Sequence, residues 1–230
     1  MRKYTTLLFD NDNTIMDFTA AEHAALKKAF LELGIKISEE QVKIYSDINE
    51  NCWKQFERGE ITKPDVLRLR FERFVESQKF DLAPSAAAAA YENNLSLEHI
   101  VFDGAFNLLE QLKADFDLYL VTNGAEHIQK RRLKESGVEN YFLKLFISEQ
   151  MGTQKPKKEY FDAVLSQINE TDKSKVLIIG DSLTSDILGG INAGLDTCLF
   201  NPFGKPDSSD GIVPTYVVRN YDDIRKLVYQ

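Results

Sequence analysis

The chain has 230 residues, of which 43% are hydrophobic and 28% are charged, and its formal net charge is −8 at pH 7. This length allows one large domain, or a core with a smaller insertion. The acidic balance argues against nucleic-acid polymers and anionic membranes as partners, because both are normally bound by a basic surface. Cys52 and Cys198 lie far apart, and no stretch resembles a signal peptide or a spanning helix, so we expect a soluble, cytoplasmic protein.

The first apolar run is followed by two carboxylates. Residues Thr6–Phe9 have the length and character of a buried parallel strand, and Asp10 and Asp12 come directly after it. In open α/β sheets, ligands bind in the crevice at the carboxyl ends of the strands. Because two close carboxylates repel each other, this pair requires a cation or a shared proton.

A helical segment from Asp17 to His99 follows, and it contains no convincing strand. Its signals are a helix-spaced set at Leu26, Ala29, Phe30 and Leu33, a capping box at Ser38–Gln41, a second helix start at Thr62–Asp65, and the alanine run Ala86–Ala90. The sequence therefore predicts an all-helical module over residues 17–99, inserted between core segments 1–16 and 100–230. An insertion beside the carboxylate pair suits a lid.

Strand-like runs then alternate with helical patterns. The expected helices are Glu126–Ser136, ended by Gly137, and Lys157–Gln167, opened by Pro156. The expected strands are Leu118–Thr122, Leu145–Ser148, Val176–Gly180 and Thr197–Phe200. This alternation predicts right-handed βαβ units, and hence an α/β fold with a doubly wound parallel sheet.

Polar residues at the junctions between these elements suit phosphate chemistry. Thr122 and Asn123 end one strand where a helix begins, and Lys155 precedes a proline that keeps it ahead of the next helix. Asp181 ends a further strand, and this third strand-end carboxylate completes an oxygen-rich site for Mg²⁺, while Asp186 follows in the first turn of the next helix. Each residue alone has a simpler explanation, such as a helix cap or a solvated lysine. Their joint occurrence in this order indicates a site.

With these four motifs the chain resembles the haloacid dehalogenase (HAD) superfamily. The motifs are Asp10–Thr14, Thr122–Asn123, Lys155–Pro156 and Gly180–Asp186, and the resemblance covers the whole chain. It implies a Rossmann-like core with an α-helical cap of the C1 type, inserted after the first motif. It also implies Mg²⁺-dependent phosphoryl transfer through an aspartyl-phosphate intermediate.

The resemblance also implies a role for each motif residue. Asp10 corresponds to the nucleophile, Asp12 to the general acid and base, and Asp186 to a supporting residue that orients Lys155 or a metal-bound water. The implied metal ligands are Asp10, Asp181 and the backbone carbonyl of Asp12, and the implied phosphate-binding residues are Thr122, Asn123 and Lys155.

The chemistry of the residues agrees with these roles. A phosphate monoester is dianionic and repels Asp10, so Mg²⁺ and Lys155 must neutralise charge before a carboxylate can attack phosphorus. Asp12 distinguishes the chain from the true dehalogenases of the superfamily, which do not have aspartate at that position. The transport ATPases of the superfamily have membrane spans, which this sequence lacks.

Two longer stretches, Asn49–Thr62 and Asp186–Gly194, look like the bacterial pyrimidine 5′-nucleotidase subgroup, which acts on ordinary and non-canonical nucleoside monophosphates. Within the first stretch, Asn49, Trp53 and Phe56 are candidate specificity residues, although an aromatic pair at helical spacing is more often part of a cap core. The alternatives are a phosphoglycolate or sugar-phosphate phosphatase, a mutase-like enzyme, and a binding module without turnover. A receiver domain is disfavoured by the insertion and the length. No sequence feature indicates an oligomeric state.

Overall fold

The computed structural model describes residues 3–230, and the chain divides into two compact units. The first, here called the core unit, ends its first segment at Asp17 and resumes at Val101, and the second, the cap unit, spans Phe18–Ile100. The helical insertion thus interrupts the core between its first strand and the rest of its sheet. The expected boundaries at residues 16/17 and 99/100 lie one residue from these.

Within the described residues, six parallel strands form one sheet in the order β3-β2-β1-β4-β5-β6. The strands are β1 (Thr6–Phe9), β2 (Asp117–Thr122), β3 (Lys144–Ile147), β4 (Val176–Gly180), β5 (Asp196–Phe200) and β6 (Tyr216–Val218). The predicted bounds of β1 and β4 are confirmed, and the other predicted strands shift by one residue. The edge strand β6 was not predicted, because three residues with an exposed central Val217 give no periodic signal.

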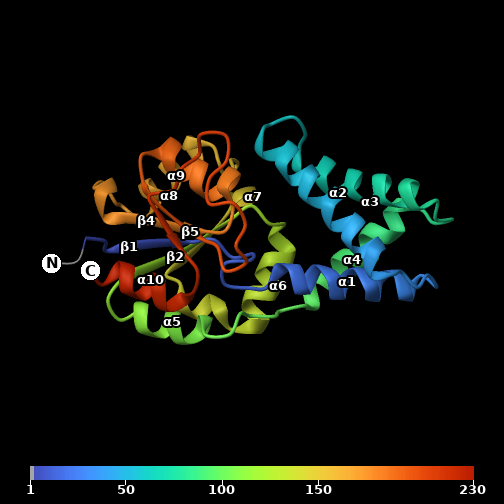
Figure 1. The fold of residues 1–230 in the computed structure, drawn as a ribbon, viewed down its shortest axis with the longest axis horizontal. Coiled ribbons are helices and arrows are strands. Elements are labelled where there is room, and N and C mark those ends of the chain that lie inside the picture. Colours follow the sequence, from blue (N-terminus) through green and yellow to red (C-terminus); the bar gives the residue numbers. More distant parts are fainter. Residues whose placement is uncertain (1–2) are drawn as a thin grey trace. The chain divides into compact units, whose positions relative to one another are not determined.

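Helices cover both faces of this sheet, which confirms the doubly wound α/β fold (Figure 1). Leu7 and Phe9 of β1 belong to a buried cluster with α5 (Ala105–Leu112) and α10 (Tyr221–Val228). The intervening Leu8 faces the other way, into a cluster with α8 (Lys158–Gln167) and α9 (Leu188–Ala193). Successive side chains of a strand point to opposite faces, so a strand buried on both sides must be apolar throughout, as β1 is.

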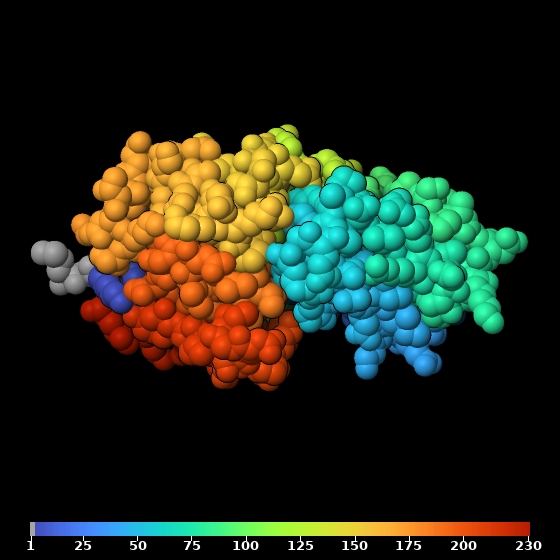
Figure 2. Space-filling view, turned by 90° about the horizontal axis from the view of Figure 1, so that it is seen from above, coloured from blue at the N-terminus to red at the C-terminus, as the bar shows by residue number. Residues whose placement is uncertain are grey.

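The remaining elements of the core unit connect these layers. They are α6 (Glu126–Ser136), η1 (Val138–Tyr141), α7 (Ser148–Met151), η2 (Lys173–Lys175) and the π-helical turn η3 (Leu183–Ile187). The predicted bounds of α6 are confirmed, and Gly137 ends it in the left-handed conformation with a φ of 78°. Figure 2 shows the surface of this unit: the residues of α8 and α9, coloured gold to orange, lie next to the residues that follow them in the sequence, coloured orange to red.

Among its described residues 18–100 the cap unit contains helices and no strand, as predicted. The helices are α1 (Phe18–Glu32), α2 (Glu39–Glu57), α3 (Lys63–Gln78) and α4 (Pro84–Leu97). The predicted capping box at Ser38 and the predicted helix start at Thr62 are confirmed, the second also as a reciprocal capping box, and the alanine run lies in α4. Leu33 follows the end of α1 rather than lying in it.

In the part of the chain that the structure describes, no helix is both long and apolar enough to span a bilayer.

Candidate active site

The loop after β1 holds Asp10 at the end of its strand. Asp10 is 6% exposed, and its Oδ2 is 3.4 Å from the hydroxyl of Thr14, which donates to it. The loop turns because the carbonyl of Asn11 accepts the backbone N–H groups of Thr14 and the two residues that follow, while Asn13 adopts a left-handed φ of 58°. Asparagine tolerates this conformation better than most residues do. The turn therefore fixes the carboxyl group beside the neighbouring strand ends.

Lys155 connects two of the site's carboxyl groups. Its Nζ donates to Asp10 Oδ1 at 2.7 Å, to Asp186 Oδ1 at 2.6 Å and to the carbonyl of Val121 at 3.1 Å. A lysine ammonium has three N–H donors, so these contacts use all of them. The side chain is 2% exposed. A buried ammonium thus forms the positive centre of the site.

Asn123 and Thr122 follow β2 beside this ammonium. The Asn123 side chain accepts the backbone N–H of Lys155 at 3.0 Å and donates to the Lys155 carbonyl at 2.8 Å, so it fixes the main chain that carries the ammonium. Thr122 Oγ1 accepts the N–H of Gly124 at 3.0 Å, and its own hydroxyl hydrogen can still donate to a phosphate oxygen. A phosphate-binding role for both residues stays a prediction.

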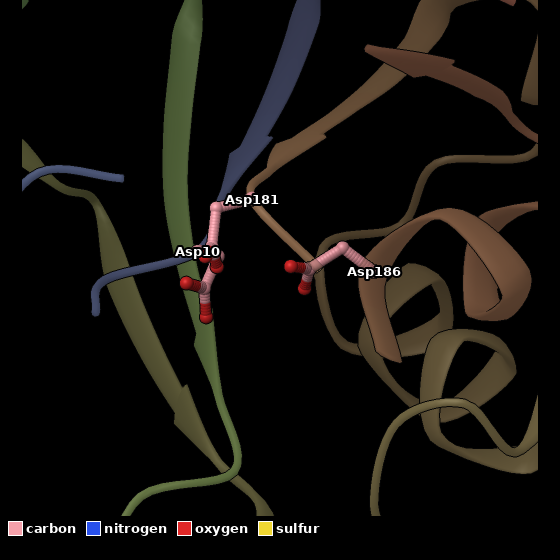
Figure 3. Close-up of side chains that lie close together, drawn as sticks. All are labelled: Asp10, Asp181 and Asp186. Carbon is pink, nitrogen blue, oxygen red and sulfur yellow. The ribbon is translucent and has the colours of Figure 1, made fainter. Parts of the chain in front are cut away.

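Asp181 and Asp186 complete a three-carboxylate cluster at the ends of β1 and β4. Oxygen atoms of Asp10, Asp181 and Asp186 lie within 4.8 Å of one another (Figure 3). Asp186 lies on η3, and its Oδ2 also accepts the N–H of Ser182 at 3.2 Å. A Cβ at Gly180 would lie 2.2 Å from that same Oδ2, so the close approach of Asp186 to β4 requires glycine.

The charges of this cluster do not balance. Burial raises the pKa of Asp10 well above its usual range, the Lys155 ammonium opposes the shift, and the carboxylates of Asp186, Asp181 and Asp12 add to it. Burial, with the negative charge of Asp186, raises the pKa of Asp181 to about 7. Burial lowers the pKa of Lys155, but Asp10 and Asp186 outweigh that effect and hold it above its ordinary value. The three carboxyl groups therefore share the buried ammonium of Lys155 and the exposed ammonium of Lys205, which lies 3.7 Å from Asp181, and a further cation would relieve their repulsion.

The donor set fits Mg²⁺. This ion prefers oxygen ligands and is usually held by one or two carboxylates, with water and phosphate in its other positions. Asp10 and Asp181 offer such oxygens at adjacent strand ends, and Asp181 keeps a side chain 20% exposed toward solvent. The side chain of Asp12 lies outside this cluster, because its carboxylate contacts α6 instead.

Comparison with known proteins decides the family. A family model of the haloacid dehalogenase-like hydrolases matches residues 4–194. The chain belongs to this family. It is 42% identical to the HAD-hydrolase YfnB of Bacillus subtilis over 99% of this chain and 97% of YfnB. A crystal structure of YfnB bound to magnesium superposes with a TM-score of 0.94 and covers all of both chains.

Two further relatives of this haloacid dehalogenase-like hydrolase have names that state an activity. The pyrimidine 5′-nucleotidase PynA of Streptococcus pneumoniae is 39% identical, over 96% of this chain and 93% of PynA. The pyrimidine 5′-nucleotidase YjjG of Escherichia coli is 33% identical, over 98% of each chain. The expected membership of the HAD superfamily, with a pyrimidine nucleotidase-like subgroup, is confirmed.

The three predicted specificity residues of this hydrolase lie on α2 of the cap unit. Asn49 is 3% exposed, and its amide bonds to Glu22 at 2.7 Å and Arg70 at 3.3 Å inside the cap. Phe56 is 5% exposed in a small apolar cluster, and Trp53, which is partly buried, packs edge-on against it with ring centroids 5.8 Å apart. These contacts describe packing within the cap, and a role in reading substrate stays a prediction.

Sequence reasoning missed three residues around the site. Gln129 and Arg132 of α6 bind the Asp12 carboxylate, and no apolar periodicity in that helix marks their side as the buried one. Lys205, in the loop after β5, has an exposed side chain, and its Nζ lies 3.7 Å from Asp181 Oδ2. No local pattern could have predicted this contact, because it depends on the tertiary path of the loop after β5.

Proposed function

We propose that this protein is a Mg²⁺-dependent phosphomonoester hydrolase, acting through an aspartyl-phosphate on Asp10, whose substrates are pyrimidine or non-canonical nucleoside 5′-monophosphates. The main support for this chemistry is the arrangement of four charged side chains: the Lys155 ammonium bonds to Asp10 and Asp186, and Asp181 lies beside them. The substrate class is supported by the names of PynA and YjjG, which match this chain along nearly its whole length. The partner is a small phosphorylated molecule.

In the first half of the reaction, Asp10 attacks phosphorus. Its Oδ1 is held by Lys155, while among residues 3–230 its Oδ2 has only the long contact with Thr14, so Oδ2 is the attacking atom. A bond forms between Oδ2 and phosphorus as the bond to the nucleoside 5′-oxygen breaks, and Asp12 gives its proton to that oxygen. Bound Mg²⁺ neutralises phosphate charge and so allows one anion to approach another.

In the second half, water attacks the phosphorus of the aspartyl-phosphate and passes a proton to Asp12. The bond between Oδ2 and phosphorus breaks, and the Asp10 carboxylate and inorganic phosphate are released. Lys155 keeps Asp10 in place throughout, since its three hydrogen bonds are made to the protein. The same two aspartates thus serve both transfers.

A substrate panel tests this function against its alternatives. Phosphate release is measured with UMP, dTMP, phosphoglycolate and hexose phosphates, each with Mg²⁺ and with a chelator. We expect the highest kcat/KM for the pyrimidine nucleotides and no activity in chelator. A preference for phosphoglycolate or a sugar phosphate would keep the chemistry and replace the substrate class, whereas no release from any ester would indicate a binding module.

A further inference from the structure

Two polar residues occupy the buried stripe of α6, next to Ile128 and Leu133. Gln129 is 2% exposed and the side chain of Arg132 is fully buried. Burying a guanidinium is costly unless it is paired, and an apolar side chain would pack this helix onto the sheet without that cost. The placement of Arg132 and Gln129 therefore requires an explanation other than packing.

Both residues bind Asp12. Arg132 Nη1 donates to Oδ1 at 2.6 Å, and Gln129 Nε2 donates to Oδ2 at 2.6 Å, so each carboxylate oxygen has a donor from α6. The orientation of the Gln129 amide is itself set, because its Oε1 accepts from Asn11 Nδ2 at 2.6 Å. The backbone makes room for this arrangement, since a Cβ at Gly124 would lie 2.2 Å from Gln129 Nε2.

We propose that Arg132 and Gln129 are positioning residues that hold Asp12 for proton transfer, an inference that rests on the acid and base role of Asp12 proposed above. A general acid must lie within hydrogen-bond reach of the leaving oxygen, and its geometry must be fixed by its neighbours. Asp12 lies on a loop with 24% of its side chain exposed, so its own packing does not fix it. The hydrogen bonds from Arg132 and Gln129 of α6 fix its carboxylate instead.

The two contacts differ in strength, which assigns the proton to one oxygen. Both bonds are made to a carboxylate, but Arg132 pairs it with an opposite charge, whereas the donor of Gln129 is a neutral amide. Oδ1 therefore stays on Arg132, and Oδ2 exchanges its bond from Gln129 for the leaving oxygen. The Oδ2–H bond breaks, the proton passes to the nucleoside oxygen, and the carboxylate that remains is stabilised by Arg132. In the second half, Oδ2 takes a proton from water, and Arg132 stays charged throughout.

The test uses two substrates that differ in their need for an acid. UMP has a poor alkoxide leaving group, whereas p-nitrophenyl phosphate has one that needs little protonation. We expect Arg132→Met and Gln129→Met to lower the single-turnover rate of the first half-reaction on UMP by about 10- to 100-fold, as misplacement of a catalytic group does, and to lower that rate on the aryl phosphate much less. The matched control is Arg131→Met, because Arg131 is an exposed neighbour on the same helix that pairs with Glu135.

A double-mutant comparison separates positioning from stability. In an Asp12→Asn background, Arg132→Met should leave the ratio of the two activities unchanged, because no proton remains to be positioned. Equal losses on both substrates in the wild-type background, or a ratio that Arg132→Met still changes in the Asp12→Asn background, would overturn the inference while leaving the proposed function standing. If Arg132→Met does not fold, Gln129→Met and Arg132→Lys decide in the same way. Wild-type protein that hydrolyses neither substrate would remove the proposed function and this inference together.

Discussion

At the scale of single residues, Lys155 supplies the buried positive charge that offsets the carboxylates of the site. Its ammonium is buried, and its three donors are used by Asp10, Asp186 and the carbonyl of Val121. Breaking a buried ion pair on one side is strongly destabilising, because the other charge is left uncompensated. Any substitution of Lys155 should therefore be visible in stability as well as in turnover.

We predict that Lys155→Met lowers the free energy of unfolding by about 3–5 kcal/mol, and that Mg²⁺ restores stability in this variant more than it does in the wild type. The added cation would relieve the repulsion that the ammonium no longer screens. Denaturant unfolding with and without Mg²⁺ measures both effects. Lys158→Met is the matched control, because Lys158 forms an exposed helical pair with Asp162, and its removal should cost less than about 0.5 kcal/mol. An identical response to Mg²⁺ in all three proteins would contradict the account.

Substitution of Asp12 should affect two kinds of substrate to different extents. Asp12→Asn should reduce turnover of a nucleoside monophosphate by roughly 10²–10⁴-fold, the usual contribution of a general acid or base. Turnover of an activated aryl phosphate should fall much less in its first half-reaction, and single-turnover kinetics on the two substrates measures the difference. Equal reductions would mean that Asp12 acts through the metal or through local geometry.

At the scale of elements, β1, β2 and β4 place their functional residues close together because these strands are parallel and end at one edge of the sheet. This regularity is why Asp10, Thr122 and Asp181 could be placed from the sequence: an apolar run of strand length followed by a polar residue fixes position without knowledge of packing. The contacts of α6 could not be predicted in this way. Which side of a helix meets the β1 loop depends on how the helix packs, and the sequence of α6 has too few apolar residues to show its buried stripe.

Helix ends in the cap unit follow local rules closely enough to test. Thr62 accepts the backbone N–H of Asp65, and Asp65 accepts both the backbone N–H and the hydroxyl of Thr62. Thr62→Ala should lower the free energy of unfolding of the cap unit by about 1 kcal/mol, whereas Thr62→Ser should preserve it. Thermal unfolding of both variants at neutral pH makes the comparison. Equal melting temperatures would show that the helix cap at Thr62 contributes nothing to stability.

The stabilisation by the Thr62–Asp65 capping box should depend on pH. The hydroxyl of Thr62 is the largest of the contacts that lower the pKa of Asp65 to about 2, from an ordinary value of 3.8. Because the folded pKa lies below the unfolded one, the stabilisation is present above pH 3.8 and is lost as the pH falls toward 2. The stability difference between wild type and Thr62→Ala should therefore shrink across this window, as measured by denaturant unfolding at each pH.

At the scale of the whole molecule, the core unit and the cap unit have different tasks in the proposed function. In that proposal the strand-end residues of the core would contact only the phosphoryl group, which every phosphate monoester shares, so they could not distinguish one leaving group from another. We expect substrate choice to reside in the cap unit. The cap could be predicted as a helical insertion, but the side chains that read the leaving group could not, because helix periodicity does not separate a packed aromatic from a binding one.

Trp53→Leu should change the ranking of nucleotides by kcat/KM while sparing hydrolysis of acetyl phosphate, which has no base to read. Phe56→Leu is the informative comparison, because Phe56 is 5% exposed and belongs to the same apolar cluster. If both variants keep the wild-type ranking and lose only stability, the aromatic pair serves packing and specificity resides elsewhere in the cap.

The most direct test of the central claim is to detect the phosphoryl group on Asp10. Wild-type protein is mixed with UMP and Mg²⁺, quenched in acid within one turnover, digested and examined by mass spectrometry, with Asp10→Asn protein and a chelator-treated sample in parallel. We predict that the peptide containing Asp10 gains the mass of one phosphoryl group in the wild type alone. Phosphate release without any such peptide, or sustained turnover by pure Asp10→Asn protein, would contradict the mechanism.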